Sequence, residues 1–253
     1  MKRRILLWAL ALAIIAGFVR LGIWQVDRAH YKERLLAQSR QIVSDRKPDA
    51  LYAATDAPAP ATEADAYEWT VGGGHFLPLP AIRLDNQVRN GVSGIRVYRV
   101  FQPDGARRAI LVEFGWRSLL TRTDIPAEPA PPALGQLRGL LAPPPVGGLK
   151  LGPEPIVPRP DGSLLLLRIN PDKIAEALKL KNGLAPRVLI LDPGLKVGYK
   201  RDLKVLSGTL PPEAHRAYAV QWFGLAIALA VVSIVVDRHK TRRGNDDTQR
   251  KVG

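Results

Sequence analysis

Two long apolar segments lie near the ends of this 253-residue chain and dominate its pattern of hydrophobic and polar positions. The first covers residues 5–24 and contains one charge, Arg20, whose long side chain can reach the headgroup layer from near the end of a span. The second covers residues 215–236 and is free of acidic and basic residues from Ala217 onward. Because roughly 20 apolar residues in a helix cross a bilayer, the pattern predicts two transmembrane helices.

The first segment has one alternative interpretation, a cleaved signal peptide whose basic n-region would be Lys2, Arg3 and Arg4. A signal peptide ends in a small-x-small cleavage site, but the apolar run here ends in the sequence FVRLG at residues 18–22. An uncleaved membrane anchor is therefore favoured.

The orientation of the spans follows from the basic residues outside them. Lys2, Arg3 and Arg4 precede the first span, and basic residues also follow the second span within residues 237–253, which predicts that both termini are cytoplasmic. Residues 25–214 then form an exported domain, because long loops cross a membrane largely regardless of their charge. The expected location is a bacterial inner membrane with a periplasmic domain, or the corresponding arrangement at the mitochondrial intermembrane space.

The exported region alternates between short apolar–polar runs and turn signals, as expected for an antiparallel, strand-dominated domain. One turn signal is Asn90-Gly91, where a hairpin needs positive φ, and another is the sequence PDG at residues 103–105. A helix is predicted over residues 171–180, with Asn170 as its N-cap. The predicted strands cover residues 69–77, 81–88, 93–102, 108–116, 136–141, 164–169 and 187–191.

Three stretches of the exported region lack a strand pattern. The first span continues as a helical pattern that ends before Pro48, and residues 49–65 are rich in Ala, Pro and acidic residues, which predicts a flexible linker. Residues 126–132 and 143–160 are rich in Pro and are expected to be loops. The predicted fold class is therefore a membrane protein with two transmembrane α-helices flanking a strand-dominated α+β, barrel-like domain outside the membrane.

Composition narrows the possible functions. The chain has no Cys, which excludes disulfides, zinc–thiolate and iron–sulfur sites and a Cys nucleophile. Its net charge is +14, but many of the excess basic residues flank the spans, and no nucleic-acid motif is present. The basic residues are therefore expected to contact the lipid bilayer and not nucleic acid. No nucleophile–base pair or phosphate loop is recognisable, and Asp85, Asp104 and Glu113 are interpreted as surface or turn residues. The sequence therefore argues against an enzyme.

Aromatic and polar residues mark the same predicted membrane face of both spans. His215, Tyr218 and Trp222 have the spacing i, i+3 and i+7, which places them on one helix face, and Trp24 and Arg28 have the spacing i, i+4. Antiparallel spans bring both sets to one side of the membrane. The alternative interpretation is an interfacial aromatic belt with basic anchors, in which residues such as Gln25 and Gln221 form hydrogen bonds between the helices.

Three motifs of the chain resemble the Surfeit-locus-one family, the membrane proteins that assist assembly of haem-copper cytochrome c oxidase. They are LGIWQVDR at residues 21–28, ILVEFGW at residues 110–116 and HRAYAVQWF at residues 215–223. Glu113 and Phe114 stand where the family usually has Asn-Arg, and Arg20 interrupts a stretch that is usually apolar. The chain therefore resembles a divergent bacterial member.

The resemblance implies a function and a site. The implied function is to bind haem a at the outer membrane edge and to aid its insertion into the catalytic subunit of the oxidase, with haem a synthase as a further partner to consider. His215 would be the axial ligand of the haem iron, and the other implied cofactor contacts are Trp24, Arg28, Tyr218 and Trp222. The alternative is a cofactor-free membrane scaffold that stabilises the catalytic subunit during assembly.

Overall fold

The computed structural model describes residues 2–62, 64–119, 127–145, 155–203, 205 and 209–250. Parts of the two predicted Pro-rich loops and the last three residues of the predicted basic tail lie outside this part of the chain. The chain forms two compact units, a helical unit made of residues 1–34 and 210–253 and a barrel unit made of residues 35–209.

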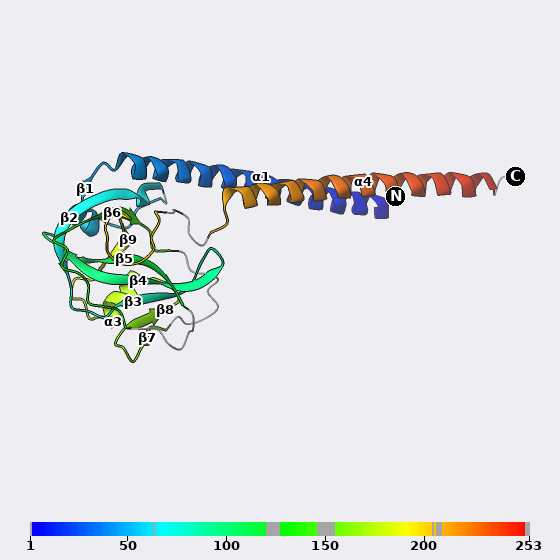
Figure 1. The fold of residues 1–253 in the computed structure, drawn as a ribbon. Coiled ribbons are helices and arrows are strands. Elements are labelled where there is room, and N and C mark those ends of the chain that lie inside the picture. Colours follow the sequence, from blue (N-terminus) through cyan, green and yellow to red (C-terminus); the bar gives the residue numbers. More distant parts are fainter. Residues whose placement is uncertain are drawn as a thin grey trace. The chain divides into compact units, whose positions relative to one another are not determined.

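The helical unit contains the part of α1 (Lys2–Asp45) that ends at Arg34, together with α4 (Pro212–Arg250). The two helices lie antiparallel and side by side (Figure 1). Both helices are long and apolar enough to cross a membrane. Their large apolar side chains are mostly uncovered by protein; Val220, for example, is 72% exposed. Such surfaces are stable in lipid and not in water, so the two predicted transmembrane helices are confirmed. The prediction that the first helix ends before Pro48 is also confirmed.

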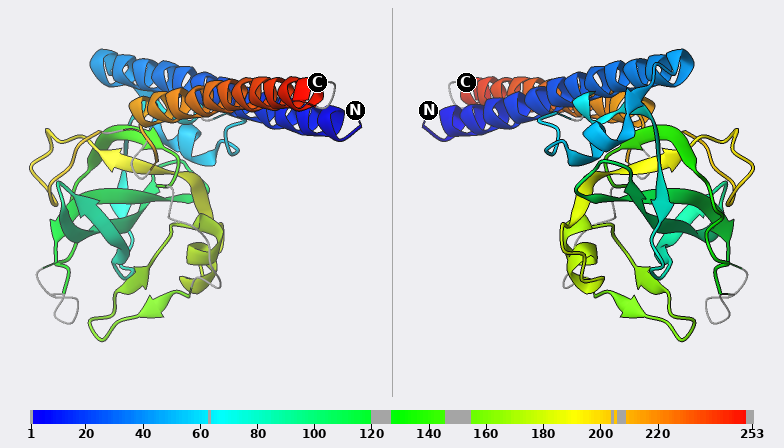
Figure 2. Two further views of the ribbon diagram at one scale, coloured as in Figure 1. Left: turned by 90° about the vertical axis from the view of Figure 1, so that its right-hand side faces the viewer. Right: turned by 90° about the vertical axis from the view of Figure 1, so that its left-hand side faces the viewer.

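Five strands of the barrel unit close into a ring, which confirms the predicted barrel-like architecture (Figures 1 and 2). The order around the ring is β2 (Glu68–Phe76), β6 (Gln136–Ala142), β9 (Leu184–Leu191), β5 (Ala109–Ser118) and β4 (Val92–Pro103), and β4 pairs back with β2. The sheet extends beyond β4 through three further strands and is joined at its other end by one more. These are β3 (Ile82–Arg89), β8 (Leu164–Leu166), β7 (Val157–Pro158) and β1 (Asp49–Ala50).

The closure of the ring depends on the Gly run in β2. Gly74 has φ +151° and pairs with Pro103, and a Cβ atom at Gly74 would lie 2.3 Å from the backbone oxygen of Gln102. Only glycine tolerates this combination of backbone angle and close approach. β2 therefore bends at this glycine, which is the place where it leaves β6 and meets β4.

The predicted strands are all present, with ends that differ by at most three residues, and the Asn90-Gly91 hairpin turn has the expected positive φ values of 52° and 77°. The antiparallel prediction is incomplete, because β5 pairs with β9 and β3 pairs with β8 in parallel. These partners lie far apart in the sequence, and alternation within a strand carries no information about which distant strand it joins.

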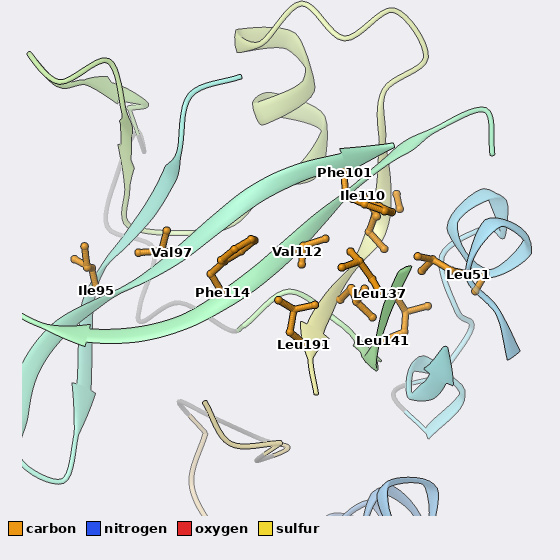
Figure 3. Close-up of a cluster of buried hydrophobic side chains, with 13 residues drawn as sticks. Leu51, Ile95, Val97, Phe101, Ile110, Val112, Phe114, Leu137, Leu141 and Leu191 are labelled. Carbon is orange, nitrogen blue, oxygen red and sulfur yellow. The ribbon is translucent and has the colours of Figure 1, made fainter. Parts of the chain in front are cut away.

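Apolar side chains form one cluster inside the ring and a second on its outer face. The inner cluster contains Phe101, Val112 and Leu189, and Figure 3 shows its side chains converging from several strands. The outer cluster contains Ile82, Val100 and Leu111, and it is covered by α3 (Pro171–Ala177) and β8. Asn170 caps α3 as predicted, since its side-chain oxygen accepts hydrogen bonds from the backbone N–H groups of Asp172 and Lys173.

The predicted flexible linker over residues 49–65 has a different structure in its first half. Residues Asp49–Ala50 form β1, and Leu51–Asp56 form the short helix α2. Leu51 is fully buried and enters the inner cluster beside Leu137 and Leu141 (Figure 3). The segment is ordered because Leu51 and Ala54 of α2 pack into the inner cluster, although the composition of this segment resembles that of a linker. A short 3-10 helix, Ala64–Ala66, follows.

Candidate functional site

The candidate site lies in the helical unit, where the first turn of α4 packs against the middle of α1. More than two turns further along α4, the helices pack closely because residue 22 is glycine: a Cβ atom at Gly22 would lie 2.7 Å from the ring of Phe223. Two polar contacts hold the start of α4 and the chain just before it against α1. The Lys32 ammonium donates to the carbonyl oxygen of Leu210 at 2.5 Å, and Arg216 forms an ion pair with Glu33.

His215 is the centre of this region. It is 6% exposed, and its Nδ1 atom lies 2.6 Å from Oε1 of Gln25, which is a short hydrogen bond between the two helices. Its Nε2 atom is also buried and has no hydrogen-bond partner. Buried polar atoms normally find a partner, so an unpartnered imidazole nitrogen needs an explanation.

The Trp24 side chain lies beside the histidine. The Trp24 ring meets the His215 ring edge-on, with centroids 6.5 Å apart and an interplanar angle of 85°. Trp24 itself is 55% exposed, so one of its faces is open to the surroundings. The Arg28 guanidinium lies over the ring of Tyr31, 4.9 Å from its centroid.

The two remaining predicted site residues lie farther along α4. Trp222 packs against Phe18 with ring centroids 5.6 Å apart, two turns from His215, and Tyr218 is 42% exposed. Of the residues proposed from the sequence, the structure therefore brings His215 and Trp24 into contact. The structure adds Gln25 to this group. The sequence indicated Gln25 as a residue that forms a hydrogen bond between the helices, but it did not indicate His215 as the partner.

The chemistry available at this site is that of a single imidazole. Within the described part of the chain, no group of three His, Cys, Asp or Glu side chains could hold a metal ion. An iron held in a porphyrin needs fewer protein ligands, and a neutral imidazole with one nitrogen hydrogen-bonded and the other carrying a free lone pair is a common axial ligand. The donor set fits a haem, but Nε2 is enclosed, so a macrocycle would reach it only through a local separation of the helices or a turn of the ring.

Two clusters of buried charges in the barrel unit were not foreseen. Glu113, expected at the surface, is 3% exposed; its carboxylate accepts hydrogen bonds from Arg96 at 3.1 Å and from the Tyr98 hydroxyl at 3.0 Å. Burial raises the pKa of Tyr98 well above its usual value, and the nearby Glu113 carboxylate adds a smaller increase. The phenol therefore stays a neutral hydrogen-bond donor.

The second cluster is centred on Glu128. Its carboxylate contacts Arg83 at 3.3 Å, Arg117 at 3.1 Å and the hydroxyl of Tyr199. Arg83 is fully buried and also pairs with Asp161 at 2.7 Å. These partners come from distant parts of the sequence, so no local pattern could have revealed them. In both clusters the opposite charges pair with one another, which is the arrangement of a structural network.

Comparison with known proteins gives a family. A sequence model described as the SURF1 family, which is the Surfeit-locus-one family, matches residues 12–227. This range includes most of α1, the whole barrel unit and the first part of α4, so the chain belongs to the SURF1 family. The family is linked to the assembly of cytochrome c oxidase and is one of assembly factors that are not known as catalysts. No curated protein matches the chain.

Proposed function

We propose that this protein holds haem a at the α1–α4 pair during assembly of cytochrome c oxidase and aids its insertion into the catalytic subunit. His215 is the axial ligand of the haem iron in this proposal. The observation that carries it is the buried Nε2 atom of His215, which has no hydrogen-bond partner while Nδ1 is engaged by Gln25.

The surroundings of His215 support a large amphipathic ligand. Exposed apolar side chains on both helices suit a macrocycle and its isoprenoid tail, and the open face of Trp24 provides an aromatic surface. Arg28 and Arg216 carry guanidinium groups that can bind the propionates. When bound, haem a would be a cargo whose iron needs one good nitrogen ligand. Tyr218 and Trp222 are proposed to line the same face of α4.

The proposed location is a bacterial inner membrane. Basic residues flank the outer ends of both spans, which favours cytoplasmic termini and a periplasmic barrel unit. In this orientation His215 lies at the periplasmic end of its span. The catalytic subunit of the oxidase is the proposed protein partner, and haem a synthase is a proposed source of the haem.

A scaffold without a cofactor is the second candidate function. It is favoured by the enclosure of Nε2, because a histidine packed between helices can serve only to hold them together through its bond to Gln25. In that case the exposed apolar faces of α1 and α4 would contact the catalytic subunit directly.

The two candidates differ in whether the purified protein carries pigment. The full chain is expressed in cells that make haem a and purified in mild detergent, and its visible spectrum and extracted pigment are recorded. We expect haem a in the wild type, loss or alteration of its spectrum in His215→Ala, and no change in His30→Ala, which alters an exposed histidine. A colourless wild type that still co-purifies with the oxidase subunit would reject haem binding and favour the scaffold.

A further inference from the structure

We infer that Gln25 is a positioning residue that fixes the tautomer of His215, so that Nδ1 carries the proton and the lone pair lies on Nε2. The step from this tautomer to an iron ligand rests on the proposed function. The tautomer itself does not, because it follows from the contacts of the two side chains.

The argument begins with the hydrogen bond. An amide oxygen is an acceptor only, so the 2.6 Å contact between Gln25 Oε1 and His215 Nδ1 requires a proton on Nδ1. A neutral imidazole carries one such proton, which leaves Nε2 without one. A histidine side chain in water favours the opposite tautomer, with the proton on Nε2. Gln25 therefore selects the form that a free histidine would populate less.

The environment reinforces this selection. Nε2 has no acceptor for a proton, so the alternative tautomer would bury an unpaired N–H group as well as break the bond to Gln25. The edge-on contact with Trp24 also limits rotation of the ring about its own axis. Gln25 and Trp24 are adjacent on α1, so one turn of this helix determines both the orientation and the protonation of His215.

The consequence for a bound metal follows from general ligand chemistry. The group that accepts the second N–H of a metal-bound histidine orients the ring and raises its basicity, and replacing such a group costs about 10–100-fold in metal affinity. Replacement of Gln25 by Glu puts a stronger hydrogen-bond acceptor opposite His215 Nδ1. Replacement by Leu removes the acceptor and keeps a side chain of similar size. The two variants are expected to shift the properties of the iron in opposite directions.

The first test needs no haem. The full chain, labelled with ¹⁵N in its four histidines, is examined by NMR in detergent, and the His215 signals are assigned by their loss in His215→Ala. We expect the Nδ1–H tautomer in the wild type and in Gln25→Glu, and a shift toward Nε2–H in Gln25→Leu. Gln221→Leu, which changes an exposed glutamine on α4, serves as the matched control and should leave the signals unchanged. A wild-type His215 with its proton on Nε2 would overturn the inference.

The second test uses protein loaded with haem a. We expect Gln25→Leu to lower the iron–histidine stretching frequency and to raise the midpoint potential, and Gln25→Glu to do the reverse. Equal properties in all three proteins would contradict a positioning role. The Nδ1–H tautomer in a protein that binds no haem a would instead reject the proposed function and leave the assignment of Gln25 intact, so the two failures can be told apart.

Discussion

At the scale of single residues, the barrel unit buries charges that hold one another in place. Asp192 is fully buried and pairs with Arg138 at 2.8 Å and with Arg46 at 3.3 Å, and Arg46 also lies over the ring of Trp69. Arg46 directly follows the last residue of α1, Asp45. Within the barrel unit, Asp192 therefore fixes the end of α1 to the strands β2, β6 and β9.

Glu113 is expected to contribute strongly to the stability of the barrel unit. Glu113→Gln leaves the half-buried Arg96 without its ionic partner, and removing one member of a buried ion pair costs about 3–5 kcal/mol. Thermal unfolding of the full chain in detergent, followed by the strand signal in circular dichroism, should show a clearly lower midpoint. The matched control is Glu176→Gln at an exposed position of α3; an equal effect of both variants would refute the role of the ion pair.

Asp192 is expected to make the stability of the barrel unit depend on pH. Burial raises the pKa of this carboxyl, but the N–H of Gly194 and the Arg138 and Arg46 guanidinium groups outweigh it, so the net pKa lies below the ordinary value of 3.8. A lowered folded-state pKa stabilises the fold above the unfolded-state pKa, and this stabilisation is lost as the pH falls through the folded-state value.

The measurement is the unfolding midpoint of the wild type and of Asp192→Asn as a function of pH. The difference between them should be largest at about pH 6 and should shrink as the pH falls below the ordinary carboxyl pKa of 3.8 and toward the lower folded-state pKa. Asp49→Asn, at an exposed position, is the control. A difference that stays constant over this range would show that Asp192 does not act through its charge.

At the scale of elements, local sequence signals predicted local structure well and distant contacts poorly. The Asn170 cap and the Asn90-Gly91 turn were predictable because each depends on neighbouring residues. The parallel pairing of β5 with β9, the docking of α2 through Leu51 and the ion clusters depend on residues far apart in the sequence. The bond between Gln25 and His215 joins residues 190 positions apart, so the sequence indicated both residues but not their contact.

The cap of α3 gives a test at this scale. Asn170→Ala removes two side-chain hydrogen bonds to the first turn, which should destabilise the barrel unit by about 1 kcal/mol, whereas Asn170→Gly should cost only a few tenths. Chemical denaturation of the full chain measures both. Asn182→Ala at an exposed turn is the control, and an Asn170→Ala protein as stable as this control would contradict the assigned cap.

The packing of α1 against α4 gives a second test. Gly22→Leu places a large side chain against the Phe223 ring, and overpacking of this kind costs about 1–3 kcal/mol, so local separation of the helices should become about tenfold more frequent. Because the chain has no native Cys, the buried Ala219 can be replaced by Cys as a reporter for labelling with a membrane-permeant maleimide.

The labelling rate of this reporter should rise in Gly22→Leu. It should stay unchanged in Gly17→Leu, because a Cβ atom at Gly17 meets nothing within 4 Å. Equal rates in the two backgrounds would mean that the contact between Gly22 and Phe223 does not hold the helices together.

At the scale of the whole molecule, two transmembrane helices flank a closed barrel, and the candidate cofactor ligand lies on the helices. The barrel unit has its own buried core and its own ion clusters, so substitutions at His215 or Gln25 should leave its fold intact. A defect caused by these substitutions can therefore be separated from misfolding. The family link to cytochrome c oxidase assembly gives the process in which such a defect should appear.

The most direct measurement is the haem a content of the oxidase catalytic subunit in cells whose own copy of this protein is replaced by a variant. The catalytic subunit is purified, and its haem a is quantified per polypeptide for the wild type, His215→Ala and the control His30→Ala. The proposal predicts a clear loss of haem a with His215→Ala at normal levels of the assembly protein, and none with His30→Ala. A full complement of haem a in the His215→Ala cells would contradict it.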